Sequence, residues 1–356
     1  MNDFFQFNNN RPTICFTRIR SSERYTKPLQ SIADSMFHVC NTFMHNNPQY
    51  SYKFFGLSFS SAWPTKSYQD IADSDYIVIP SEAEFMYHIP DRVMTIVRER
   101  TNEVLDGIRE VIDGKTIIII QSDRADSVEL YQDHVFPNND VKIHSIDECD
   151  FKGGLHSLKH HFIKRKFNAE SFDKTHDFGY WGTSKKKKVG GDLSGDVRHE
   201  VLKDLHKSDL DTLFIGNFDG FKRDVKFTRR LEDIVPHLMG CKTTLCFNWP
   251  GYDEYLTSRY NEAVACDIIP LVWKNYDINN QLVESEWQRC ESFEDIQKKC
   301  LELRDKSVRL DRLNKIKHKY KESTMNIEYY EAEFTKNMRD IIDNGKDIHS
   351  DFRSHK

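Results

Sequence analysis

An arginine and a glutamate stand one helical turn apart in the segment SRYNEAVACDIIPLVWK (258–274). The residue spacing predicts a helix over 253–266 and a buried strand over 267–273. Arg259 and Glu262 then share one face of the helix. The arginine can bind phosphate through two parallel hydrogen bonds, and the carboxylate can accept hydrogen bonds from a ribose diol. A salt bridge on a solvated face is the alternative, but the apolar and small residues that follow favour ligand binding.

A second candidate for anion binding is the glycine- and lysine-rich segment GTSKKKKVGGDLSGDVR (182–198). It joins a predicted strand to a predicted helix, and its backbone N–H groups, the lysines at 185–188 and Arg198 suit an anionic diphosphate. A mobile, solvated loop is the alternative, and we favour it for the middle of the lysine run.

Two carboxylates follow predicted strands of the N-terminal half. In TIIIIQSDR, Asp123 and Arg124 come just past the carboxyl end of the strand predicted over 115–122. A carboxylate in that position is a candidate general base, because closure of a cleft can raise its pKa toward the working pH. Capping of the next helix is a nearly equal alternative. Glu23 follows the first strand, predicted over 12–19, where a solvated turn is the favoured alternative.

Two series of short apolar strands must position these side chains. They alternate with segments of helical spacing, which is the pattern of parallel α/β sheets. Strands are predicted at 12–19, 52–59, 75–80, 115–122, 177–182, 211–217, 242–249 and 267–273. Helices are predicted at 28–44, 92–112, 197–207, 226–239, 253–266, 293–306 and 325–345.

The sequence therefore predicts an α/β protein of two Rossmann-like, doubly wound domains that face each other across a cleft. We place the boundary in the basic segment 151–176, with domains over 1–165 and 166–324. The C-terminal segment 325–356 is helical in pattern and could pack back across the junction. Doubly wound domains bind ligands at the carboxyl ends of their strands, which selects the loops described above.

Composition and motifs exclude several other classes of protein. No apolar run approaches the roughly 20 residues of a membrane helix, and the N-terminus lacks signal-peptide features, so we expect a soluble cytoplasmic protein. The eight cysteines form no CxxC pair and suggest reduced core thiols. Neither GxGxxG after the first strand nor GxxxxGK[ST] is present, which disfavours a dinucleotide site and a P-loop. The DSD at 73–75 precedes its strand, so we interpret it as a turn and cap and predict no metal ligands.

Four motifs, in order, resemble those of the T-even-type phage DNA-base glucosyltransferases. SSE (21–23) resembles the first-loop motif of the β-linking enzymes, and IIIIQSDR (117–124) resembles their strand ending in a catalytic Asp and the QHD motif of the α-linking enzymes. The segment 182–198 resembles the family's phosphate loop, with a lysine at one arginine position. Arg-x-x-Glu at 259–262 resembles the nucleotide clamp of the β-linking enzymes, and the ACDIIPLVWK that follows resembles the α-linking ones.

The resemblance implies a GT-B architecture and a UDP-sugar donor. Arg259 and Arg198 would contact the diphosphate and Glu262 the ribose, and the phosphate loop would contribute Gly182, Ser184 and Lys185. The sugar, glucose or arabinose, and the anomeric outcome stay open. A divalent cation, Mg²⁺ or Mn²⁺, is compatible with the diphosphate, without ligands that the sequence names.

The implied acceptor is 5-hydroxymethylcytosine in double-stranded phage DNA, with the base flipped out of the duplex. Asp123 would be the base, and Glu23 and Arg124 would lie near the sugar and acceptor. Two stretches, 156–167 and 221–230, mix basic residues with Phe and could track DNA phosphates, although solvated helix faces are the alternative. Their candidate contacts are Lys159, Lys164, Arg165, Lys166, Lys222 and Arg223.

The implied protein is a phage-encoded monomer in the host cytoplasm, with no membrane partner. Two rivals remain at this point. One is a GT-B enzyme with a lipid, wall-polymer or small-molecule acceptor, and the other is a non-catalytic DNA-binding protein, which would have no use for the pair Arg259 and Glu262.

Overall fold

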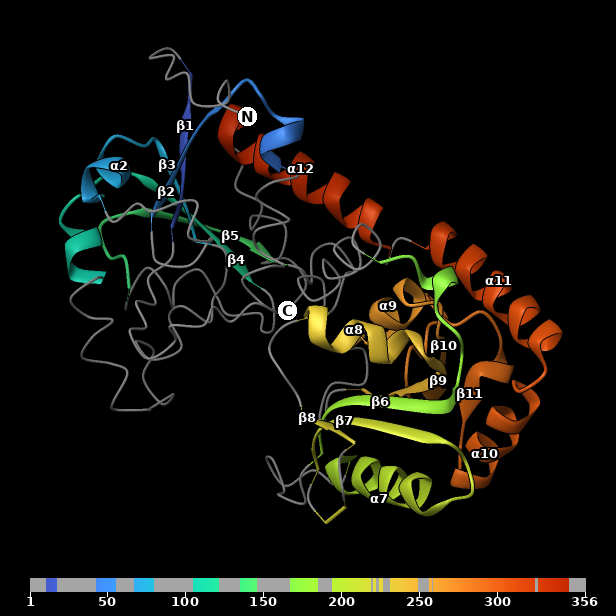
Figure 1. The fold of residues 1–356 in the computed structure, drawn as a ribbon. Helices are drawn as coiled ribbons and strands as arrows, with labels where there is room; N and C mark the ends of the chain where they lie inside the picture. The colour runs from blue at the N-terminus through green and yellow to red at the C-terminus, as the bar shows by residue number, and fades with distance from the viewer. Residues whose placement is uncertain are drawn as a thin grey trace. The chain divides into compact units, whose positions relative to one another are not determined.

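The computed structural model divides the chain into two compact units, Met1–Asp150 with Tyr330–Lys356, and Phe151–Tyr329. Figure 1 labels their helices and strands. Each unit holds one sheet whose strands are all parallel. The described residues are 11–17, 43–55, 67–79, 105–121, 135–145, 167–184, 194–218, 220–221, 224–226, 231–248, 256–257, 259–323 and 326–345.

The first unit contains a five-stranded sheet in the order β2-β1-β3-β4-β5. The chain moves outward from β1 to β2 and then continues on the other side of β1, which is the doubly wound arrangement. Strand β4 is the apolar run TIIIIQ, and Ile117, Ile118 and Ile119 are fully buried, as expected of a strand covered on both faces. The elements are β1 (Thr13–Thr17), β2 (Ser51–Phe55), α2 (Tyr68–Ala72), β3 (Tyr76–Ile79), β4 (Thr116–Gln121) and β5 (Asp140–Ser145).

The last helix, α12 (Ile327–Asn344), packs on the first unit. The Tyr76 hydroxyl donates to the Ile342 carbonyl at 2.8 Å. Arg339 donates to the side chain of Asn47, and Phe334 packs edge-on against Phe43, with ring centroids 5.9 Å apart. The C-terminal segment therefore completes the core of the N-terminal sheet.

The second unit contains a six-stranded sheet in the order β11-β10-β9-β6-β7-β8. The chain runs from β6 outward through β7 to β8, then returns to β9 on the other side of β6. This is the strand order of the dinucleotide-binding Rossmann fold, with its reversal between β6 and β9. The strands are β6 (His176–Ser184), β7 (Thr212–Phe218), β8 (Val225–Lys226), β9 (Cys241–Cys246), β10 (Ile269–Trp273) and β11 (Arg289–Cys290). The helices are η4 (Ala169–Ser171), α7 (Ser194–Lys207), α8 (Leu231–Met239), α9 (Arg259–Ala265), η5 (Glu286–Gln288), α10 (Phe293–Glu302) and α11 (Lys306–Glu322).

Successive side chains of β6 enter different layers of the second unit, as the pleat of a strand requires. Trp181 belongs to an apolar cluster with Val235 of α8 and Ala263 of α9. Phe178 instead packs on Phe214 of β7, and Phe214 in turn contacts the His206 ring of α7. Figure 1 shows α7 and α8 on opposite sides of strands β6 and β7.

The α/β class with two doubly wound sheets is confirmed, and each of the eight predicted strands overlaps an observed one. The sequence missed the strands β5, β8 and β11, the helices α2 and α11, and the short helices η4 and η5. The helix expected over 226–239 begins only at Leu231, because the preceding Val225–Lys226 pairs with β7 as strand β8. The helix expected over 293–306 ends at Glu302, and a new helix follows the cap at Asp305, whose carboxylate accepts from two backbone N–H groups.

The expectation of reduced core thiols is confirmed for the six described cysteines, which are buried and free. They are Cys15, Cys241, Cys246, Cys266, Cys290 and Cys300. Burial raises the pKa of the Cys246 thiol to about 12. Within the described part of the chain, no helix is both long and apolar enough to cross a membrane.

Candidate functional site

The carboxyl ends of β6 and β9 mark the reversal point of the second sheet. The connections from these neighbouring strands leave toward opposite sides, which opens a crevice in folds of this type. Strand β6 ends with Gly182, Thr183 and Ser184, and the segment after β9 leads to α9, which begins at Arg259. The fold therefore brings two of the sequence-predicted motifs to one edge of the sheet.

Arg259 is held against β6 by its guanidinium group. Its Nη2 donates to the Trp181 carbonyl at 2.5 Å, and its Cζ lies 4.1 Å from the centroid of the Tyr180 ring. Its Nε is buried and has no hydrogen-bond partner among the residues that the structure describes. A buried N–H group without a partner is costly, so an acceptor such as a phosphate oxygen would be stabilised here.

Glu262 is buried at the same edge, with 7% of its surface exposed. Its Oε2 accepts a hydrogen bond from Trp181 Nε1 at 2.6 Å. One residue thus contacts both members of the predicted pair: Arg259 through its carbonyl oxygen and its ring, whose centroid lies 5.5 Å from Cζ, and Glu262 through its indole N–H. Sequence reasoning missed Trp181, although its position directly before Gly182, the last residue of the strand predicted over 177–182, was a usable signal.

Glycine is required near the ends of two neighbouring strands, β6 and β7. Gly182 has φ +130° and Gly216 of β7 has φ +151°, values that favour glycine. A Cβ atom on Gly216 would lie 1.8 Å from the Gly182 carbonyl oxygen, and a Cβ on Gly182 would lie 3.1 Å from Nη2 of Arg259. The two glycines therefore allow the strand ends to approach each other and leave room for the guanidinium group.

The segment after β10 also holds α9 in place. The Tyr260 hydroxyl donates to the Leu282 carbonyl at 2.7 Å and accepts from Gln288 Nε2 at 3.3 Å. The segment is itself fixed by Asp277, whose carboxylate accepts from three successive backbone N–H groups beginning at Gln281. Because α9 is anchored both to β6 and to the segment after β10, Arg259 and Glu262 lie on a rigid support.

Arg198 is partly buried in α7, the helix that follows the lysine-rich segment. Like Arg259, it has a buried Nε without a hydrogen-bond partner in the described part of the chain. Helix α7 packs on β6 and β7, and the ring of its His206 lies 5.6 Å from that of Phe214 in β7. Arg198 is therefore positioned by the same strands that carry the glycines.

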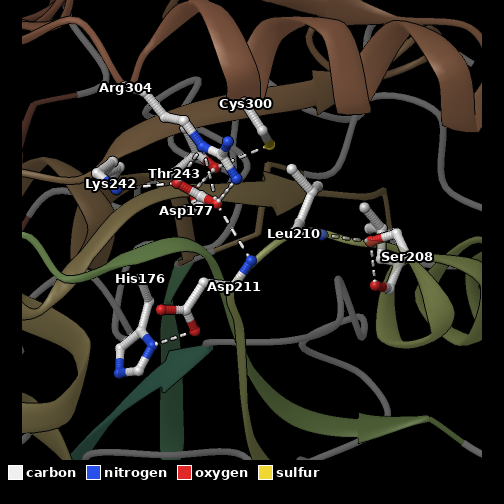
Figure 2. Close-up of polar contacts among 10 residues, drawn as sticks. His176, Asp177, Ser208, Leu210, Asp211, Lys242, Thr243, Cys300 and Arg304 are labelled. Carbon is white, nitrogen blue, oxygen red and sulfur yellow. Dashed lines mark hydrogen bonds and ion pairs between the residues drawn. The ribbon is translucent and has the colours of Figure 1, made fainter.

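A charged network lies at the opposite, amino end of β6 (Figure 2). Asp177 is 2% exposed and accepts from Lys242 Nζ at 2.9 Å and from Arg304 Nη2 at 2.7 Å. Burial alone would raise the pKa of Asp177, but the hydrogen bonds from Arg304, Lys242 and the Asp211 amide together outweigh it and lower the pKa to about 2. Folds of this type do not bind ligands at this end, so we assign the network to stability.

The structure brings together Gly182, Arg259 and Glu262, and it places Ser184 at the end of β6 and Arg198 in α7. The other sequence-predicted site residues lie outside the described residues and stay predictions: Glu23, Asp123, Arg124, Lys159, Lys164, Arg165, Lys166, Lys185, Lys222 and Arg223. Among the described residues, no group of three or more His, Cys, Asp or Glu could hold a metal ion.

The sequence matches no family model and no curated protein. The structure is similar to that of T4 phage β-glucosyltransferase in complex with its UDP-glucose substrate, with a TM-score of 0.60 and 14% identity over 93% of this chain and 99% of that chain. A T4 phage β-glucosyltransferase structure that addresses substrate binding and catalytic mechanism matches with a TM-score of 0.59 and 15% identity, over the same shares of both chains. A structure of the DNA modifying enzyme β-glucosyltransferase, solved with and without its substrate uridine diphosphoglucose, matches with a TM-score of 0.59 and 12% identity, over 93% of this chain and 99% of that chain. The chain therefore has the two-domain GT-B fold of the T4 phage β-glucosyltransferase, the enzyme type that its motifs resemble.

Proposed function

We propose that this protein is a glycosyltransferase that moves a sugar from a UDP-sugar to the hydroxymethyl group of 5-hydroxymethylcytosine in double-stranded DNA. The observation that carries the proposal is the arrangement of Arg259 and Glu262 around Trp181, at the reversal point of a Rossmann sheet. The fold supports it, because a structurally similar β-glucosyltransferase is a DNA modifying enzyme whose substrate is uridine diphosphoglucose.

The donor half of the proposal rests on the second unit. Arg259 offers a planar cation and a buried Nε to the diphosphate, and Arg198 offers a second buried Nε. A carboxylate accepts several hydrogen bonds, so Glu262 can bind ribose hydroxyls while it accepts from the indole. Gly182 and Ser184 at the end of β6, with Lys185 after it, add the phosphate loop.

The acceptor half rests on the sequence motifs. Asp123 takes the proton of the hydroxymethyl group while the oxygen attacks the anomeric carbon of the sugar. The bond from that carbon to the diphosphate oxygen breaks, and UDP leaves with the electron pair. The two arginines stabilise the negative charge that develops on the leaving diphosphate. This sequence of steps inverts the anomeric carbon.

The reacting hydroxyl is on a base that is stacked inside a duplex, so the base must be flipped out before the reaction. Glu23 and Arg124 are the proposed contacts of the sugar and acceptor. The clusters Lys159 to Lys166 and Lys222 with Arg223 would bind DNA phosphates without regard to sequence. Glucose and arabinose are the proposed sugars, and a divalent cation at the diphosphate is compatible with the mechanism.

The test compares Asp123→Asn with Asp126→Asn, a matched control three residues along the same segment. Loss of a general base typically lowers a rate by ~10²–10⁴. Asp123→Asn should lose turnover to that extent and keep the wild-type dissociation constant for UDP, whereas Asp126→Asn should retain both. Wild-type turnover in Asp123→Asn would remove Asp123 from the mechanism, and a wild-type protein that does not bind UDP would remove the donor half.

A further inference from the structure

We propose that Trp181 is a positioning residue that couples the phosphate contact of the nucleotide site to its ribose contact. The inference rests on the proposed UDP site and adds a residue that the sequence motifs do not contain. Trp181 meets Arg259 through its carbonyl oxygen, at 2.5 Å from Nη2, and meets Glu262 through its indole Nε1, at 2.6 Å from Oε2.

The indole hydrogen bond determines where the carboxylate of Glu262 lies. A hydrogen bond from a neutral N–H to a carboxylate is charge-assisted, and 2.6 Å is short for this kind of contact. Trp181 is itself 6% exposed and packs in a cluster with Ala263, Cys266 and Ile268, so the indole has little freedom. The carboxylate is therefore presented in one orientation, which suits a pair of ribose hydroxyls.

The carbonyl of the same residue determines how Arg259 presents its donors. The hydrogen bond to the Trp181 carbonyl uses one of the two N–H groups of Nη2, and the ring centroids of Tyr180 and Trp181 lie 4.1 and 5.5 Å from Cζ. The Nε is buried and has no partner among the described residues. The carbonyl of Trp181 and the aromatic rings beside the guanidinium thus fix the phosphate donor, while the indole N–H of Trp181 fixes the ribose acceptor.

This division of roles makes Trp181→Phe an informative substitution. Phenylalanine keeps the carbonyl and an aromatic ring beside the Arg259 guanidinium, but it removes the indole N–H group. The variant should therefore lose the orientation of Glu262 and keep that of Arg259. We expect UDP to bind about tenfold more weakly, which corresponds to the loss of one hydrogen bond to a charged group. Binding of inorganic pyrophosphate, which has no ribose, should stay at the wild-type level.

The chain offers a matched control at Trp287. Its Nε1 donates to Glu302 Oε2 at 3.3 Å, and the guanidinium of Arg312 lies 4.3 Å from its ring centroid. Trp287→Phe therefore removes a similar tryptophan-to-glutamate contact from η5, away from the end of β6. Titration calorimetry on this variant should give wild-type affinities for UDP and for pyrophosphate.

The coupling itself is tested by combining Trp181→Phe with Glu262→Gln. If the indole acts through the carboxylate, Trp181→Phe should weaken UDP binding no further once Glu262 is changed. Additive losses in the double variant would overturn the inference. So would equal losses for UDP and pyrophosphate in Trp181→Phe, which would mean general damage to the site.

A measurement without nucleotide separates this inference from the proposed function. The five tryptophans give five indole N–H signals in a nitrogen-15 spectrum, and Trp181→Phe identifies one of them. Glu262→Gln should shift that signal, and Glu302→Gln should leave it in place. No shift would overturn the positioning role whatever the protein binds. A shifted signal in a wild-type protein that fails to bind UDP would overturn the proposed function and the ribose role, but not the contact.

Discussion

A Cβ atom placed on Gly182 would lie 3.1 Å from Nη2 of Arg259, although the two residues are far apart in the sequence. The glycine also adopts φ +130°, a conformation that side chains with a Cβ rarely tolerate. The end of β6 is therefore shaped by a residue that has no side chain, and the guanidinium group fills the space next to it.

Replacing this glycine should affect both folding and binding. Gly182→Ala should destabilise the protein by about 1–3 kcal/mol through backbone strain, and it should weaken UDP and pyrophosphate alike because it displaces Arg259. Gly114→Ala is the control, because Gly114 has φ +72° and open space around its Cβ position. That variant should lose stability only. If calorimetry finds wild-type affinities in Gly182→Ala, the glycine does not position the arginine.

Removal of the guanidinium group should weaken nucleotide binding directly. Arg259→Ala should cost on the order of 1.5–3 kcal/mol of UDP binding, as expected for a hydrogen bond to a charged group. Arg259→Lys keeps the positive charge but loses the planar guanidinium, so its affinity for UDP should lie between those of the wild type and Arg259→Ala. The affinity for pyrophosphate should fall in the same order. Glu262→Gln should weaken the binding of UDP and leave the binding of pyrophosphate unchanged. If Arg259→Ala and Glu262→Gln both keep the wild-type dissociation constant for UDP, the two residues have a structural role only and do not bind the nucleotide.

The network at the other end of β6 should contribute stability and no binding. Asp177→Asn should cost about 3 kcal/mol of unfolding free energy, the lower end of the range for a broken buried ion pair, because Arg304 is half exposed. Asp211→Asn removes an exposed pair with His176 and should cost less than about 1 kcal/mol. Chemical denaturation measures both, and UDP affinity should be unchanged. A similar cost for the two variants would contradict the buried role of Asp177.

The same network around Asp177 predicts how the free energy of unfolding depends on pH. The pKa of Asp177 is lowered from its ordinary value of 3.8 to about 2, so the folded protein holds the proton less tightly than the unfolded chain does. The contribution of Asp177 is therefore complete above about pH 4 and is lost as the pH falls toward about 2. The difference in unfolding free energy between wild type and Asp177→Asn should shrink over that window. A constant difference down to pH 2 would contradict the lowered pKa.

The central strands could be predicted from the sequence because they are apolar runs between helical segments. The strands that were missed carry weaker signals. Strand β5 alternates apolar residues with Lys142 and His144 at the edge of its sheet, and β8 and β11 are two residues long and depend on a neighbouring strand. Helix α11 buries only three residues, Leu313, Ile316 and Tyr320, so its apolar stripe is narrow.

The candidate site was predictable in part for the same reason. Arg259 and Glu262 are close in sequence, so their shared face follows from helical spacing. Their common partner Trp181 is 78 and 81 residues away from them, and only the pairing of β6 with β9 brings it to the site. A contact that depends on tertiary structure leaves no periodic pattern in the sequence.

The most direct test of the account is mass spectrometry of nucleosides from DNA treated with the protein and a panel of UDP-sugars. Two duplexes of one sequence are compared, with 5-hydroxymethylcytosine in the first and plain cytosine in the second. We predict that both duplexes bind, that only the hydroxymethylated base gains the mass of a sugar, and that Asp123→Asn abolishes most of this gain. If no hydroxymethylated duplex is modified with any common UDP-sugar, while a lipid or small-molecule acceptor is, the proposed DNA acceptor is wrong.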